Sequence, residues 1–219
     1  MWFRLYVWLA GLWVKLFIQT GLYYHYSRIV RSVVEYKFRH GPPLRKYANY
    51  TQLLDEAQRW KWRADTWRVG WDSFSYPSRV QDSINRRDPN IGDCDDWSLY
   101  LAWVLRALED AGRIFEGYRC LWFRVLTVNW VDEHARKVKG HNVCVFILQP
   151  LGGGAPQYAH VSNWDKAHIK TGRYNGTPYA SLEEVANDLT SNGRLLGWAV
   201  CDLDLHLVRS KDYGRYDVR

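Results

Sequence analysis

Residues 92–112 read GDCDDWSLYLAWVLRALEDAG, and this stretch decides the fold class. Its apolar residues recur at the three- and four-residue spacing of one helix face, and a glycine follows the last of them. The pattern predicts a helix from about Asp93 to Ala111, ended by Gly112. The apolar face consists of Trp97, Leu101, Val104, Leu105 and Leu108.

Cys94 falls in the first turn of this predicted helix. The free backbone N–H groups and the positive end of the helix dipole at such a position stabilise a thiolate, which is the reactive form of cysteine. Steps of three to Trp97 and seven to Leu101 place Cys94 on the apolar face, toward the rest of the protein. Cys94 is therefore a candidate nucleophile, although a cysteine taken alone is more often a packing residue.

Downstream of this helix, β-branched and aromatic residues cluster in segments that predict strands. The glycine run 152–154 predicts a hairpin between the second and third strands, and Ser181 with Glu184 fits the capping box of a short helix. The predicted fold class is α+β, with the Cys94 helix packed on an antiparallel sheet. The predicted strands are Arg119–Val128, His141–Leu148, Tyr158–Trp164 and Gly197–Val208.

Two features are expected upstream of the central helix. Residues 51–69 predict a helix opened by Thr51, and residues 71–91 contain turn formers that predict a loop. These turn formers are Pro77, Pro89 and Asn90.

His141 opens one predicted strand, and strict alternation would put Val143 and Val145 on its face. Placed beside Cys94, its imidazole could take the thiol proton and return it to a leaving group. Such a histidine needs a third group to fix its tautomer. We expect Asn163 on the next strand in that role, with Asp165 as the alternative.

The segments GDCDDWSLYLAWVLRALEDAG, GHNVCVFI and HVSNWD together resemble the transglutaminase-like cysteine peptidases, particularly their bacterial branch. The resemblance covers about Tyr76 to Trp164. It implies a papain-like core and a thiol peptidase or amidase with a Cys94–His141–Asn163 triad. Asn163 stands where the family generally has aspartate. The other positions that match the family motif are Gly92, Asp93 and Asp96, with Asp96 expected to be a structural brace.

The N-terminal third has a different composition from the rest of the chain. Residues 1–69 contain 12 Lys and Arg against 4 Asp and Glu, while residues 70–219 contain 18 against 19. Residues 5–24 approach the length of a membrane span, but Lys15 interrupts them. We therefore expect a separable arm, residues 1–43, that contacts a membrane or docks into an assembly, and a catalytic domain, residues 44–219. If the arm spans a membrane, the domain should be cytoplasmic.

Neither a metal nor a cofactor is predicted, because the cysteines and histidines have no ligand spacing and the glycine run lacks a nucleotide motif. The expected substrate is a protein, a peptide or the peptide of a bacterial cell wall, cleaved by acyl transfer to Cys94. Nucleic acid is the less favoured partner, since only charge suggests it. The alternative function is a structural or assembly protein, for example of a virus particle, that keeps the fold with little or no activity.

Overall fold

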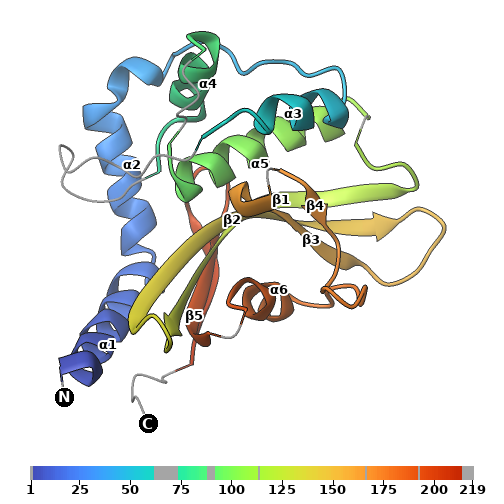
Figure 1. Cartoon of the computed structure of the whole chain (residues 1–219). Coiled ribbons are helices and arrows are strands. Elements are labelled where there is room, and N and C mark those ends of the chain that lie inside the picture. The colour runs from blue at the N-terminus through green and yellow to red at the C-terminus, as the bar shows by residue number, and fades with distance from the viewer. Residues whose placement is uncertain are drawn as a thin grey trace.

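A computed structural model of the chain describes residues 2–61, 74–87, 92–112, 114–165, 167–191 and 193–213. Its centre is a six-stranded antiparallel sheet in the order β4-β3-β2-β1-β5-β6 (Figure 1). The fold is therefore α+β, as predicted. The strands are β1 (Tyr118–Asp132), β2 (Lys137–Pro150), β3 (Gln157–Val161), β4 (Ile169–Lys170), β5 (Arg194–Cys201) and β6 (Leu207–Asp212).

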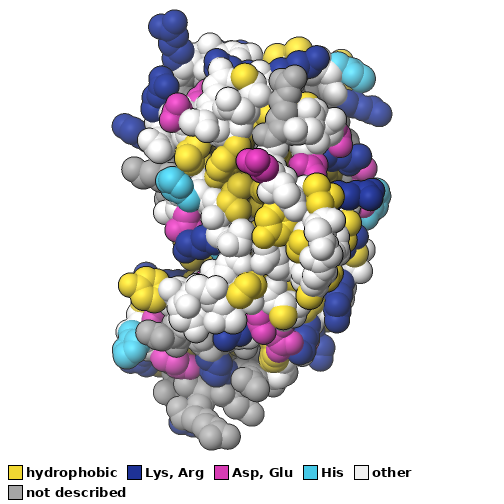
Figure 2. All heavy atoms as spheres, turned by 90° about the vertical axis from the view of Figure 1, so that its right-hand side faces the viewer, with side chains coloured by type: hydrophobic (Ala, Val, Ile, Leu, Met, Phe, Trp, Pro, Cys, Tyr) yellow, Lys and Arg dark blue, Asp and Glu magenta, His cyan; other side chains and the backbone are white. Residues whose placement is uncertain are grey.

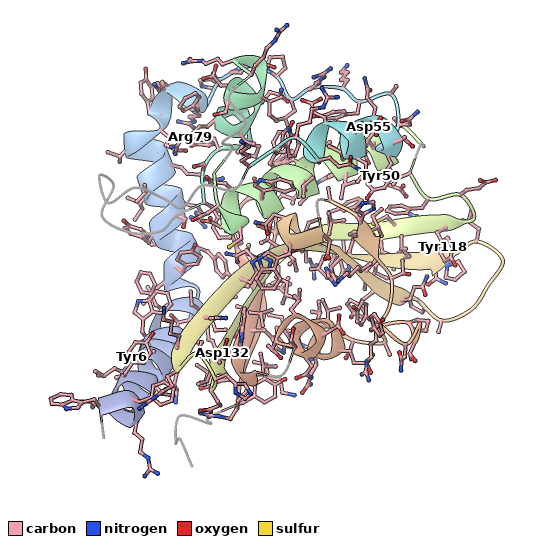
Figure 3. All side chains as sticks on the ribbon, viewed as in Figure 1. Tyr6, Tyr50, Asp55, Arg79, Tyr118 and Asp132 are labelled. Atoms are coloured by element: carbon pink, nitrogen blue, oxygen red, sulfur yellow. The ribbon has the colours of Figure 1, made fainter. Side chains whose placement is uncertain are left out.

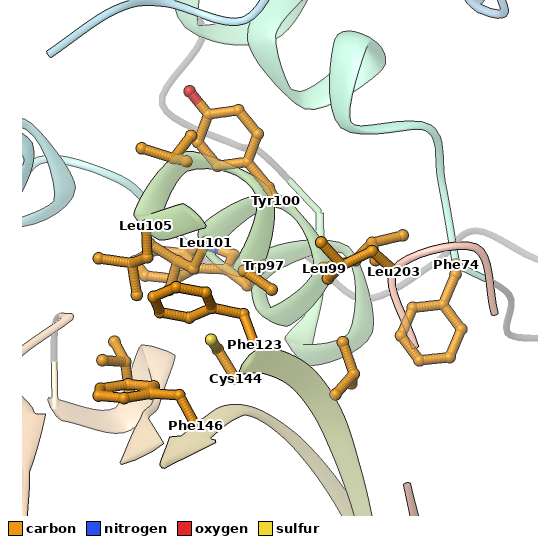
Figure 4. Close-up of a cluster of buried hydrophobic side chains, with 14 of the residues drawn as sticks. Phe74, Trp97, Leu99, Tyr100, Leu101, Leu105, Phe123, Cys144, Phe146 and Leu203 are labelled. Atoms are coloured by element: carbon orange, nitrogen blue, oxygen red, sulfur yellow. The ribbon is translucent and has the colours of Figure 1, made fainter. Parts of the chain in front are cut away.

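Helices cover both faces of this sheet (Figure 1). The predicted central helix is confirmed as α5 (Cys94–Asp110), and α6 (Leu182–Leu189) lies against the opposite face. The α5 side of the core contains Trp97, Leu101, Leu105, Phe123, Cys144 and Phe146 (Figure 4). The α6 side contains Val128, Val143, Val145, Leu182 and Val185. Because side chains alternate along a strand, these two sets assign the neighbouring residues of β1 and β2 to one face or the other.

The N-terminal arm packs on the same side of the sheet as α5. It comprises α1 (Trp2–Trp13), a π-helical turn η1 (Val14–Ile18), α2 (Leu22–Val34) and a short 3₁₀ turn η2 (Tyr36–Phe38). The buried side chains of Ile18, Tyr23 and Tyr24 belong to one core with Leu101 of α5. Residues on both sides of Gly41–Pro43 thus share a core, and the arm is not packed separately as its composition had suggested.

A narrow stripe attaches α1 and η1 to the sheet. Val7, Gly11, Val14 and Ile18 are buried at helical spacing. Tyr6 lies beside the same end of the sheet as Asp132 (Figure 3), and its hydroxyl accepts a hydrogen bond from the Val138 N–H at 3.4 Å. Most of the remaining surface of α1 faces outward.

No single helix in the described residues has the length and apolar composition of a membrane span. The bent pair Trp2–Ile18 and Leu22–Val33 passes that test together, with an angle of 65° at the break.

Two connecting segments differ from the sequence-based expectation. The helix α4 (Pro77–Asn85) occupies part of the predicted loop, because Pro77 takes the first helical position, where its missing N–H costs nothing. Pro89 and Asn90 lie outside the described residues. The helix α3 (Tyr50–Ala57) begins near Thr51, capped by the Asn49 side chain, and residues 62–69 of the predicted helix are also outside the described part.

The strand boundaries also differ in ways that matter for the site. The hairpin between β2 and β3 and the Ser181 cap of α6 are confirmed. However, β2 starts at Lys137, so His141 is inside the strand, opposite Val128 of β1. A 3₁₀ turn, η4 (Asn163–Asp165), replaces the end of the predicted third strand. The predicted last strand is divided into β5 and β6.

Candidate functional site

The entry to α5 fixes the position of Cys94. Asp93 is the extended cap residue, and Cys94 is the first residue of the helix. Gly92 has a φ of 114°, and a Cβ there would lie 2.1 Å from the Asp96 Oδ2 atom. The other oxygen of Asp96 accepts a hydrogen bond from the Ser75 N–H at 2.6 Å. Gly92 and Asp96 thus hold the start of α5 against the segment before α4.

Cys94 borders a pocket of about 250 Å³ on the α5 face of the sheet. The pocket lies between the first turn of α5, the β1–β2 hairpin and the N-terminal arm. Its walls therefore combine polar side chains from the strands with mainly apolar ones from the arm. The lining residues include Ala10, Trp13, Val14, Ile18, Tyr23, Cys94, Thr127, Asn129, Gly140, His141 and Asn142.

Asn142 is the β2 side chain that reaches Cys94, with its Nδ2 donating toward the Cys94 Sγ at 3.8 Å. A chain of hydrogen bonds orients this amide. The Tyr24 hydroxyl donates to the Thr127 Oγ1 at 2.9 Å, so the Thr127 hydrogen is directed to the Asn142 Oδ1. The oxygen of Asn142 therefore faces Thr127 and its NH₂ group faces the sulfur.

Strand alternation assigns the His141 side chain to the other face of the sheet. It lies opposite Val128, whose side chain packs on the α6 side. The His141 ring stacks on Trp164 with 3.5 Å between ring centroids, and Trp164 also contacts Trp130 of the α6-side cluster. Although His141 borders the Cys94 pocket, its ring is arranged around contacts made on the α6 side. The His141 ring contacts Ser162 and Trp164, and its pairing with Cys94 stays a prediction.

Ser162 holds the His141 imidazole, with 2.8 Å between Nε2 and Oγ. Burial lowers the pKa of His141 to about 3, and the nearby His160 adds a smaller lowering. The ring is therefore neutral near pH 7. A serine next to a desolvated imidazole supplies no charge to stabilise an imidazolium.

Asn163 and Asp165 do not hold His141 in this structure, which corrects the expected orienting residue. The reason is local: β3 ends at Val161, so the alternation assumed through residue 164 stops early. Asp165 Oδ1 pairs with the Lys170 Nζ at 3.2 Å. The Asn163 Oδ1 is buried without a hydrogen-bond partner among the described residues.

Asn129 is a pocket residue that the sequence analysis did not identify. It is 5% exposed, and its Nδ2 has no hydrogen-bond partner within the part of the chain that the structure describes. Asn129 lies opposite Gly140, and Thr127 lies opposite Asn142, so these residues share the α5 face. Two asparagines in otherwise apolar strands, at positions that register places together, are the signal that could have indicated them.

The other cysteines are packing residues. None of the four cysteines forms a disulfide. Burial raises the pKa of Cys120 to about 12, and it also raises the pKa values of Cys144 and Cys201. Within the described residues, no group of three or more His, Cys, Asp or Glu could hold a metal ion. Cys94 is thus the thiol whose surroundings suit chemistry.

Comparison of the chain with protein-family models, with curated proteins and with solved structures finds no match.

The burial of His160 leads us to expect that the folded state loses stability in acid. It is 1% exposed, and both ring nitrogens lack a hydrogen-bond partner among the described residues. Burial lowers its pKa to about 4; Lys170 adds to this, while Asp165 and Asp188 oppose it. The unfolded chain takes up a proton below pH ~6.5 and the folded chain does not, so folding weakens as the pH falls from ~6.5 toward 4.

The wild type should lose free energy of unfolding between pH 7 and pH 4. We expect His160→Leu to lose ~3 kcal/mol less over the same range, measured by urea unfolding. His206→Leu is the matched control, because the His206 side chain is 58% exposed. An unchanged pH dependence in His160→Leu would show that His160 is not buried as a neutral ring.

Proposed function

We propose that this chain is a transglutaminase-like thiol protein that accepts acyl groups on Cys94. The observation that carries the proposal is the Cys94 sulfur at the first position of α5, beside a pocket in which the Asn142 amide donates toward it. A helix that opens with cysteine and packs on an antiparallel sheet supports the likeness to the papain-like core. The motif from Gly92 to Asp96 adds to that likeness.

The position of His141 decides which acyl donors suit this site. Hydrolysis of an amide requires an acid that protonates the departing amine. The β2 side chain bonded to Cys94 is an asparagine, which cannot supply that proton. The favoured donors are therefore activated acyl groups, such as thioesters and esters of acidic alcohols, whose leaving groups depart as anions.

The Cys94 thiol loses its proton to solvent, and the thiolate forms a bond to the carbonyl carbon while the carbonyl electron pair moves to oxygen. When that pair returns, the bond to the leaving group breaks and the leaving group departs with its electrons. Water or an amine then resolves the thioester.

The proposal predicts that p-nitrophenyl butyrate transfers one butyryl group to Cys94 of the folded chain. Nitrophenolate release followed by peptide mass spectrometry locates the group. Cys94→Ala should give no adduct, and Cys120, Cys144 and Cys201 should stay unmodified because burial raises their pKa values. Acylation of another cysteine, or none in the folded wild type, would refute the proposal.

A second candidate, a docking or assembly role, is favoured by the exposed surface of α1 and η1. Large apolar side chains on this surface are between 37% and 78% exposed, and contiguous apolar surface of this kind usually binds something. They are Trp2, Leu5, Tyr6, Trp8, Leu9, Leu12, Trp13 and Leu16. On the side away from α1 and α2, charged side chains of both signs are interspersed with apolar ones (Figure 2).

The positive charge of the N-terminal helix indicates which docking partner suits this surface. Residues 2–18, which form α1 and η1, contain Arg4 and Lys15 and no Asp or Glu. Tryptophan, leucine and basic residues on one helix are typical of helices that lie in the surface of an anionic bilayer. We therefore propose an anionic lipid surface as the docking partner.

A further inference from the structure

The side-chain amide of Asn129 offers a buried N–H donor that has no acceptor among the described residues. The side chain is 5% exposed and borders the Cys94 pocket, and its Nδ2 has no partner among the described residues. Buried N–H groups in folded proteins are nearly always hydrogen-bonded, so an orphaned one at a pocket indicates a ligand that supplies the acceptor.

Asn142 supplies a second donor beside it. One N–H of its amide is directed to the Cys94 sulfur, which leaves the other for a ligand. The register places Asn142 opposite Thr127 and Asn129 opposite Gly140, so the two asparagines are diagonal neighbours on one face. A Cβ at Gly140 would lie 3.1 Å from the Asn129 Oδ1, so glycine gives this amide room.

The other lining residues of the pocket indicate the chemistry of the rest of the ligand. Ala10, Trp13, Val14 and Ile18 line the pocket from the arm, and no Asp or Glu is among its described lining residues. Lys139 also lines it, but its Nζ is paired with the Asp132 Oδ2 at 2.7 Å. An apolar chain fits such walls, while an oxygen acceptor fits the two amides. Both features belong to a short aliphatic acyl group.

We infer that Asn129 and Asn142 bind the carbonyl oxygen of a short aliphatic acyl group while Cys94 attacks its carbon. This inference rests on the proposed function and specifies its substrate class. As the sulfur–carbon bond forms, the carbonyl electron pair moves to oxygen, and the two amide N–H groups stabilise that negative charge. As the pair returns, the leaving group departs with its own electrons.

Two reagents separate this role from thiol reactivity in general. p-Nitrophenyl butyrate forms an oxyanion on reaction with Cys94, whereas iodoacetamide alkylates the sulfur without one. In Asn129→Ala we expect butyrylation of Cys94 to fall about a hundredfold and alkylation to be retained. Asn187→Ala, an exposed position on α6 across the sheet, is the matched control and should change neither rate.

The inference is overturned if Asn129→Ala butyrylates at the wild-type rate, or if both reactions slow equally, since the latter would indicate a structural role. If Asn129→Ala does not fold, Asn129→Leu, which is close in size and has no donor, is measured against the same limits. Failure of the proposed function itself would look different, because wild-type Cys94 would then not be butyrylated at all.

Discussion

Deletion of residues 1–43 is expected to unfold the rest of the chain. Ile18, Tyr23 and Tyr24 are buried in one core with α5, and the loss of a large buried side chain costs about 2–5 kcal/mol. Three such losses approach or exceed the whole stability of a typical domain, which is about 5–15 kcal/mol. The deletion also removes Glu35, which accepts hydrogen bonds from the Ser75 Oγ and the Tyr76 N–H.

Near-ultraviolet circular dichroism and urea unfolding would measure this effect. Deletion of residues 1–2 is the control, because the Trp2 side chain is 78% exposed. A cooperative unfolding transition retained by the chain that starts at residue 44 would show that the arm is a separate element after all.

Leu9→Glu combined with Leu12→Glu is expected to abolish binding of the full chain to vesicles of phosphatidylcholine and phosphatidylglycerol. Burial of a leucine contributes about 1.5–3 kcal/mol, so the loss of two weakens binding by more than about a hundredfold. Both side chains are exposed in the structure, so the change should leave the fold intact. Co-sedimentation with the vesicles measures the effect.

The matched control places the same charges elsewhere. Leu121 and Leu151 are 47% and 69% exposed and belong to β1 and the β2–β3 turn, away from α1. Leu121→Glu with Leu151→Glu should leave vesicle binding unchanged. The docking partner is protein rather than lipid if the wild type does not bind vesicles but forms soluble oligomers, and if Leu9→Glu with Leu12→Glu abolishes those oligomers.

The central helix and the α6 cap could be predicted because each depends on local signals. A helical apolar face and a glycine stop define α5, and the Ser181 side chain accepts a hydrogen bond from the Glu184 N–H at 3.2 Å as its spacing suggested. Neighbouring residues alone decide such features. Tertiary contacts alter them little.

The polar site depends on long-range strand register, which local sequence signals do not determine. Which of His141 and Asn142 faces Cys94 is decided by the pairing of β1 with β2, and a change of one residue moves a side chain to the opposite face. The early end of β3 displaced Asn163 from its expected role in the same way. The contribution of Tyr24 to the core could not be seen from composition, because an apolar helix can pack inward or face a membrane.

In the proposed reaction, amides from the β1–β2 hairpin, and not the His141 imidazole, assist the Cys94 thiol. The most direct test is the second-order rate of Cys94 butyrylation in the wild type and in His141→Gln, with folding monitored in both. We expect His141→Gln to keep the wild-type rate, because the imidazole is hydrogen-bonded to Ser162 and stacked on Trp164. Removal of a true general base would slow the reaction by roughly 10²- to 10⁴-fold, and a loss of that size in folded His141→Gln would show that His141 is the base for Cys94.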